Sequence, residues 1–172
     1  MLIAHHRHVP AQVIAAARLN IPTLVLIRPP DDAVLSLLIR QPNMTMKRAL
    51  YDYARFYSRV LPYRKHFVIA TFQEVTLEFG GVTKRLNERF GTDFGVFDHT
   101  PDNVEACFQL IDERTRKNVA DRVGTAGIRE ETVPRPSEAR TGLKQELQQE
   151  LLSDRLAERR ARANALFREY VK

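Results

Sequence analysis

The chain has 172 residues, of which 44% are hydrophobic and 28% charged, and its formal net charge is +6. This length and composition are typical of one globular domain with a hydrophobic core and leave little room for two. No apolar run approaches the length of a membrane span, and the apolar start is too short for a secretory signal peptide. The single cysteine, Cys107, excludes an intramolecular disulfide framework. We therefore expect a cytoplasmic protein with no membrane partner.

The positive net charge has two interpretations. An excess of cations is typical of proteins that bind an anionic ligand or a nucleic acid. Many of the arginines, however, lie in the last third of the chain and alternate with glutamates in a helical pattern, which is typical of a solvent-exposed face. The sequence also contains neither a basic patch interleaved with aromatic residues nor a recognition helix. We therefore expect no nucleic-acid partner.

Short apolar runs alternate with helical patterns at the start of the chain. Leu2–Ala4 predicts a short strand that ends in a histidine cluster, and Ala11–Leu19 predicts a helix. Thr23–Ile27 predicts a second strand, and Asp31–Ile39 predicts a helix after a turn that contains two prolines. Strand, helix and strand within so few residues predict a right-handed crossover and a parallel sheet.

The middle of the chain continues this alternation. Thr45–Leu61 predicts a long helix whose aromatic stripe belongs to the core. His66–Phe72 is rich in apolar and β-branched residues and predicts a third strand. Gln73–Thr76 predicts a connector that caps a helix over Leu77–Phe90, and Gly91 ends that helix.

The second half of the chain is predicted to be helical, with one long loop. Asp102–Val119 predicts a helix in which Cys107 is a core residue rather than an activated thiol. Val123–Arg140 holds two glycines and two prolines and predicts a loop across the surface. Glu138–Tyr170 predicts one long charged helix, or two shorter ones, with leucines along its apolar side.

Three strands with helices between them predict an α/β layered domain. We expect an α/β core over residues 1–122, a surface loop over 123–137, and C-terminal helices over 138–172 that pack on the core.

Arg28 and Ser36 are candidate anion ligands. Arg28 follows a predicted strand, and Ser36 lies in the helix after it. Ligands bind at the carboxyl edge of α/β sheets, a helix N-terminus there favours anions, and the planar arginine fork suits a phosphate. In the alternative interpretation Arg28 caps a neighbouring helix or pairs with Asp31, and Ser36 is simply tolerated in its helix.

Three histidines, His5, His6 and His8, stand at the end of the first predicted strand, with His6 and His8 on one face. A histidine there suits a general base near neutral pH. A metal site is a second interpretation, but no cysteine, aspartate or glutamate of the segment completes it, and we predict no metal. The third interpretation is a set of exposed histidines at a frayed terminus.

Two common motifs of phosphate and acyl chemistry are absent from the sequence. No glycine-rich turn followed by lysine and Ser or Thr comes after a predicted strand, and no serine stands in a Gly-x-Ser-x-Gly elbow. Any phosphate contact therefore depends on Arg28, Ser36 and a later basic residue.

Three blocks of the sequence, in this order, resemble the cytosolic-type sulfotransferase family, and bacterial members of it in particular. The first is the His-Val-Pro segment that begins at His8, and the second is Arg-Pro-Pro-Asp at Arg28 with Ser36 behind it. The third is an aromatic-rich helix, then the strand Phe-Val-Ile-Ala-Thr-Phe, the turn Gln73–Thr76 and a helix that ends in Phe-Gly at Gly91. Together these blocks span roughly Leu2 to Gly91.

The resemblance implies part of a three-layer fold like that of P-loop NTPases, with a parallel sheet of about three strands. It implies transfer of a sulfuryl group from the co-substrate 3′-phosphoadenosine-5′-phosphosulfate (PAPS) to a hydroxyl or amine of a small-molecule or glycan acceptor. In this resemblance His8 removes the proton of the acceptor. The positions that would hold the nucleotide are Arg28, Ser36, Arg140 and Gly142, with Arg135 as an alternative to Arg140.

The sequence also departs from this family. The family's phosphosulfate-binding loop, Lys-x-Gly-x-Thr-like, precedes its His-x-Pro segment and is absent here, and His6 stands where the family has a lysine. Losing such donors costs on the order of a hundredfold in rate each. We therefore expect a truncated sulfotransferase-like chain with weak activity or none. The alternative is a non-catalytic α/β module that binds a partner protein through its C-terminal helix.

Overall fold

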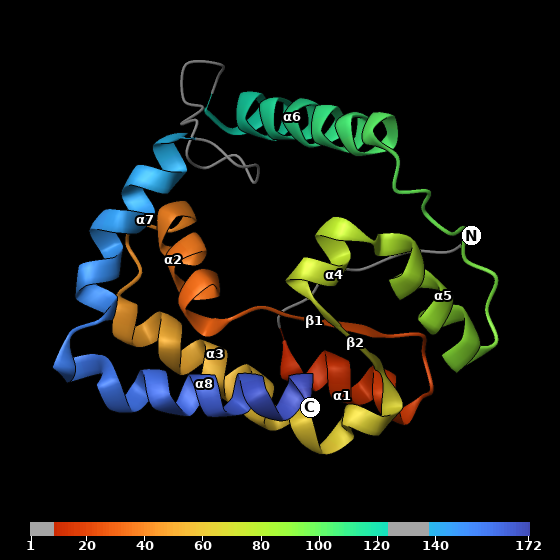
Figure 1. Cartoon of the computed structure of the whole chain (residues 1–172), viewed down its shortest axis with the longest axis horizontal. Coiled ribbons are helices and arrows are strands. Elements are labelled where there is room, and N and C mark those ends of the chain that lie inside the picture. The colour runs from red at the N-terminus through yellow and green to blue at the C-terminus, as the bar shows by residue number, and fades with distance from the viewer. Residues whose placement is uncertain (1–8, 124–137) are drawn as a thin grey trace.

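The computed structural model describes residues 9–123 and 138–172 as an α/β fold, mostly helical, with two strands paired in parallel (Figure 1). The predicted strand Leu2–Ala4 lies outside the described residues, so the described sheet has two strands where three were expected. The elements in chain order are α1 (Pro10–Arg18), β1 (Leu24–Ile27), α2 (Pro30–Arg40), α3 (Met46–Val60), the 3₁₀ helix η1 (Leu61–His66), β2 (Val68–Thr71), α4 (Phe72–Leu77), α5 (Phe79–Phe90), α6 (Pro101–Val123), α7 (Glu138–Leu151), the 3₁₀ turn η4 (Asp154–Leu156) and α8 (Ala157–Val171).

The two strands confirm the predicted parallel pairing. Leu24 lies opposite Val68, and Ile27 lies opposite Thr71. Ile27 is fully buried, as expected for a strand covered by helices. Because the strands run in the same direction, the residues that follow them leave the sheet at the same edge, and this edge holds the candidate site.

Two tyrosines of α3 cover the other side of β1. The Val68 amide of β2 donates to the carbonyl of Thr23. Carbonyls alternate in direction along a strand, so those of Leu26 and Arg28 point away from β2. The Tyr57 hydroxyl donates to the Leu26 carbonyl at 2.7 Å, and the Tyr53 hydroxyl donates to that of Arg28 at 2.8 Å. The predicted aromatic stripe is therefore core, and it also satisfies a strand edge that would otherwise be unpaired.

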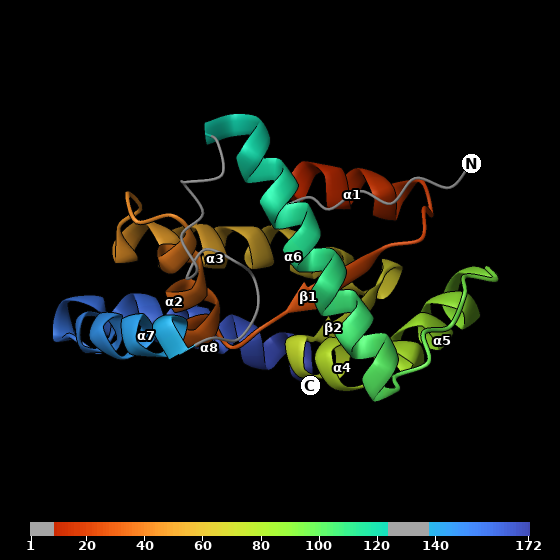
Figure 2. The same ribbon diagram turned by 90° about the horizontal axis from the view of Figure 1, so that it is seen from above.

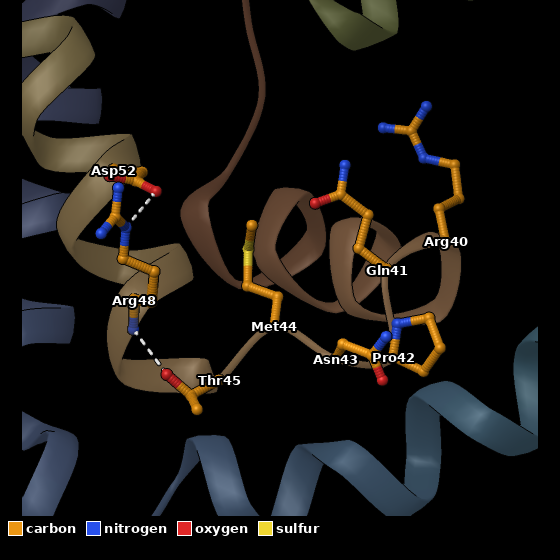
Figure 3. A pocket seen from close by; sticks show the side chains of 8 residues that line it. All are labelled: Arg40, Gln41, Pro42, Asn43, Met44, Thr45, Arg48 and Asp52. Atoms are coloured by element: carbon orange, nitrogen blue, oxygen red, sulfur yellow. Dashed lines mark hydrogen bonds and ion pairs between the residues drawn. The ribbon is translucent and has the colours of Figure 1, made fainter.

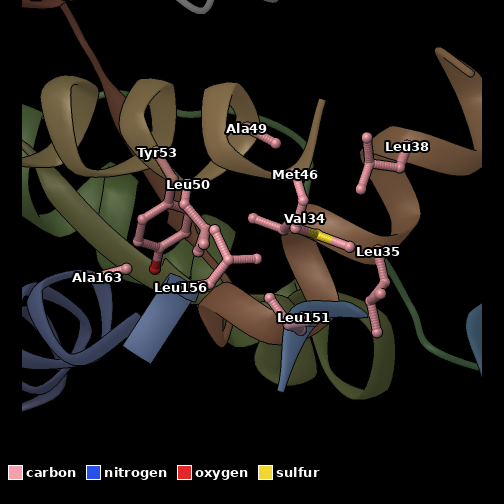
Figure 4. Close-up of a cluster of buried hydrophobic side chains, with 10 residues drawn as sticks. All are labelled: Val34, Leu35, Leu38, Met46, Ala49, Leu50, Tyr53, Leu151, Leu156 and Ala163. Atoms are coloured by element: carbon pink, nitrogen blue, oxygen red, sulfur yellow. The ribbon is translucent and has the colours of Figure 1, made fainter. Parts of the chain in front are cut away.

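The C-terminal helices complete the larger hydrophobic core (Figure 4). α7 packs on α2, and α8 packs beside α3 along its length, as Figure 1 shows. The buried cluster consists of Val34, Leu35 and Leu38 of α2, Met46, Ala49, Leu50 and Tyr53 of α3, and Leu151, Leu156 and Ala163 of the C-terminal segment. This segment forms two helices, which settles the alternative between one helix and two.

Three details differ from the sequence predictions. The connector Gln73–Thr76 is part of helix α4, because the capping box joins Thr71 to Glu74 and starts the helix directly after β2. The predicted loop Val123–Arg140 and the predicted helix from Glu138 overlap by three residues, and the start of α7 at Glu138 confirms the helix bound; residues 124–137 lie outside the described part. Leu152 is 53% exposed, since α7 ends one residue before it, and Cys107 is exposed rather than buried.

Helix α6 crosses above the two strands (Figure 2). None of its side chains over residues 101–117, the part described at that level, is buried. No helix within the described ranges is both long enough and apolar enough to cross a bilayer.

The docking of α7 on the core predicts unequal roles for two adjacent leucines. We expect Leu151→Ala to lower the free energy of unfolding by about 2–5 kcal/mol, because it leaves a cavity at a fully packed position. The matched variant Leu152→Ala removes the same atoms from an exposed side chain and should stay within about 0.5 kcal/mol of the parent chain. Urea unfolding followed by circular dichroism measures both, and equal losses would contradict this packing.

The buried tyrosines predict a loss of stability in alkali. Burial is the main cause that raises the pKa of Tyr53, Tyr57 and Tyr170 above the ordinary 10.0. Their contribution is fully present below pH 10 and declines as the pH rises toward the folded-state pKa values, because only the unfolded tyrosines ionise in that range. The slope is about 1.4 kcal/mol per pH unit for each tyrosine.

Unfolding free energies measured between pH 8 and pH 11.5 test this prediction. In Tyr57→Phe the decline above pH 10 should be shallower, and at pH 7 the variant should lose about 1–3 kcal/mol because the Leu26 carbonyl loses its donor. An absorbance titration in which all five tyrosines of the folded chain ionise as one group would contradict it.

Candidate anion-binding site

Four polar residues follow one another at intervals of four along α2 and the residues just before it. They are Arg28, Asp32, Ser36 and Arg40. Residues four apart in a helix lie on the same face, so this set forms a stripe along α2. The stripe begins at the carboxyl edge of β1 and ends at the last residue of the helix.

Helix α7 supplies a second set of cations to this stripe. The Arg140 guanidinium donates to the Ser36 hydroxyl at 3.0 Å, and Lys144 Nζ lies 3.9 Å from Asp32 Oδ1. As the residue number rises along α7, its partner's number falls along α2, so the two helices run antiparallel. Arg140 is 8% exposed, which makes it one of the buried charged residues of the described chain.

Arg28 is held at the edge of the sheet by an aromatic ring. Its guanidinium carbon lies 4.2 Å from the centre of the Phe72 ring, within the range of a cation–π interaction. One step beyond the Ile27–Thr71 pair, the strand register places Arg28 next to Phe72. Arg28 Nη2 lies 3.8 Å from Asp32 Oδ1, while its buried Nε has no hydrogen-bond partner within the described residues.

The cations of the stripe repel one another. Burial lowers the pKa of Arg28 and Arg40 lowers it further, whereas Asp32 acts in the opposite direction. Burial also lowers the pKa of Arg140, and both Arg40 and Arg28 add to the effect. Arginine stays protonated at neutral pH despite such shifts, so the site is an electropositive surface. An anion bound there would offset this repulsion.

Ser36 adds a neutral donor to the cations. Its hydroxyl oxygen accepts the hydrogen bond from Arg140, and it donates none to the residues that the structure describes. The hydroxyl hydrogen is therefore available to a ligand. Two guanidinium groups and a hydroxyl are well suited to the oxygens of a phosphate.

The structure brings together three of the residues that the sequence singled out, Arg28, Ser36 and Arg140. Gly142 is not among them: it is exposed, and it is two residues from Arg140, about 200° around the helix and so on the outer side of α7. The carboxylate nearest to Arg28 is that of Asp32 rather than Asp31. His8 and Arg135 lie outside the described residues, as do His5 and His6.

Sequence reasoning missed three members of the site, Phe72, Lys144 and Arg40. Phe72 follows a parallel strand just as Arg28 does, so the rule that such strands end at one edge would have found it. Lys144 and Arg40 each lie four residues from a candidate, the spacing that shares a helix face.

A solvent-open hollow lies at the turn between α2 and α3, where the stripe ends (Figure 3). Its lining includes Arg40, Met44 and Arg48. Arg48 is paired with Asp52 at 2.6 Å, and Arg40 points away from that pair in Figure 3. Arg48 is thus already paired with a carboxylate, and Arg40 belongs with the stripe.

In the described part of the chain, no three histidine, cysteine or carboxylate side chains lie close enough together to hold a metal ion.

Comparisons of the chain with protein-family models, with curated proteins and with solved structures find no match.

Proposed function

We propose that this chain binds the 3′-phosphate of a PAPS-type nucleotide through Arg28, Ser36 and Arg140, as part of a sulfotransferase-like domain related to the P-loop NTPase fold. The observation that carries the proposal is the hydrogen bond between Arg140 and Ser36, whose positions are 104 apart. The resemblance in sequence assigns Arg28 and Ser36 to the 3′-phosphate and Arg140 to the pocket of the same nucleotide, without reference to their positions in space.

The chemistry of the site supports a phosphate monoester as the ligand. A monoester carries close to two negative charges at neutral pH and three strong acceptor oxygens. Arg28 and Arg140 supply two positive charges with fixed donor geometry, and Ser36 supplies a third donor. The unpartnered Nε of Arg28 is a further donor that a ligand would satisfy.

The proposed transfer reaction requires more than binding of the 3′-phosphate. An acceptor hydroxyl or amine attacks the sulfur, the bond from sulfur to the bridging oxygen of the nucleotide breaks, and a base takes the acceptor proton. His8 is the residue proposed for this last task by resemblance. The 172 residues contain no Lys-x-Gly-x-Thr-like segment to stabilise the leaving phosphate. We therefore propose that these residues bind the nucleotide and, on their own, turn it over slowly or not at all.

The packing of the C-terminal helices bears on the alternative, a module that binds a partner protein through its C-terminal helix. Leu151, Leu156, Ala163 and Tyr170 are all buried against the rest of the chain. Most of the apolar side of this segment is thus packed on the rest of the described chain, mainly α2 and α3. This favours the nucleotide-binding proposal.

Isothermal titration with adenosine 3′,5′-bisphosphate tests the proposal. We expect saturable binding by the parent chain and at least tenfold weaker binding of adenosine 5′-phosphate, which lacks the 3′-phosphate. Arg28→Gln and Ser36→Ala should each weaken binding of the bisphosphate, and the arginine variant should do so by about 10- to 100-fold, the value of a hydrogen bond to a charged group.

Arg59→Gln is the matched control, because it removes an exposed arginine of α3 outside the stripe. It should leave the affinity within about twofold of the parent, since an isolated surface charge contributes little. Equal affinity for the two nucleotides, or equal losses of affinity in Arg28→Gln and Arg59→Gln, would contradict the proposal.

A further inference from the structure

The carboxylate of Asp32 lies between two cations of the site. Its Oδ1 is 3.8 Å from Arg28 Nη2 and 3.9 Å from Lys144 Nζ. Both distances exceed the roughly 2.7–2.9 Å of a direct charge-assisted hydrogen bond. Ion pairs elsewhere in the described chain are closer, as between Arg48 and Asp52 at 2.6 Å. One oxygen of Asp32 is therefore shared between two cations and is tightly bonded to neither.

Fold stability alone gives little reason for this arrangement. Asp32 is half-exposed, and exposed ion pairs contribute roughly 0–1 kcal/mol. It lies in the first turn of α2, where a negative charge is favourable, but Asp31 occupies the same turn.

Asp32 lies close to several cations. Arg28 and Lys144 both lie within 4 Å of its Oδ1, and Arg40 ends the same stripe. Asp32 therefore acts as a partial counter-ion in the free chain. Because it also repels any incoming anion, the same carboxylate lowers the affinity of the site.

We propose that Asp32 is an internal competitor for the anion site, and that a bound phosphate takes over Arg28 and Lys144 from it, which makes Lys144 a further phosphate-binding residue. This inference rests on the proposed binding of a 3′-phosphate at Arg28, Ser36 and Arg140. It assigns an affinity-setting role to Asp32, since removal of the competing charge frees two cations at once. A site weakened in this way releases its nucleotide more readily.

The test measures the affinity for adenosine 3′,5′-bisphosphate in Asp32→Asn, with Asp52→Asn as the matched control. Both variants remove one partly exposed carboxylate that is paired with an arginine four residues before it, but only Asp32 belongs to the stripe. We expect Asp32→Asn to bind about two- to fivefold more tightly than the parent, the range of exposed charge pairs, and Asp52→Asn to stay within about twofold. An affinity in Asp32→Asn that is unchanged or weaker would overturn the inference, and weaker binding would mean that Asp32 orients Arg28 instead.

A double-mutant cycle with Lys144→Gln tests the second half of the inference. Because Asp32 engages Lys144 in the parent, the loss on Lys144→Gln should be larger in the Asp32→Asn background than in the parent. Equal losses in both backgrounds would contradict the transfer of Lys144 to the ligand.

The two proposals fail in different ways. Binding by the parent together with identical affinities for Asp32→Asn and Asp52→Asn would refute the competitor role and leave the proposed function standing. No binding by either the parent or Asp32→Asn would refute both.

Discussion

The hydrogen bond from Arg140 to Ser36 joins two helices whose residues lie 104 positions apart, and the candidate site exists only where this contact is made. Arg140 is almost fully buried, and a buried charge is costly unless polar partners and packing around it compensate. The fully buried Leu151 and the buried Leu156 anchor the C-terminal segment on the core. The site therefore depends on the hydrophobic packing of α7 and α8 as much as on its own polar groups.

The sheet fixes the position of Arg28, the second arginine of the site. Parallel register brings Arg28 and Phe72 to one edge, and the hydroxyl of Tyr53 binds the backbone carbonyl of Arg28 itself. The backbone of Arg28 is thus held by both β1 and α3, which limits the positions that its guanidinium can take. Polar groups positioned on such elements lose little conformational freedom when a ligand binds, which favours a preorganised site.

Local patterns predicted much of this from the sequence, and contacts between distant segments set the limit. The strands, α2 and α3 follow from apolar periodicity, which is a property of neighbouring residues. Arg140 lay where the predicted loop Val123–Arg140 and the predicted helix Glu138–Tyr170 overlapped, and its helical phase was not used to separate it from Gly142. The resemblance alone placed Arg140 and Ser36 in one nucleotide site, and their contact is a tertiary one that local patterns do not predict. Lys144 was missed although it lies four residues from Arg140 in the predicted helix.

The most direct test of the account is a crystal structure of the chain with adenosine 3′,5′-bisphosphate. The account predicts density for the 3′-phosphate between α2 and α7, with oxygens within hydrogen-bond distance of Arg28, Ser36 and Arg140. A nucleotide bound elsewhere on the chain, or bound with Arg140 turned away from Ser36 and from the phosphate, would contradict it.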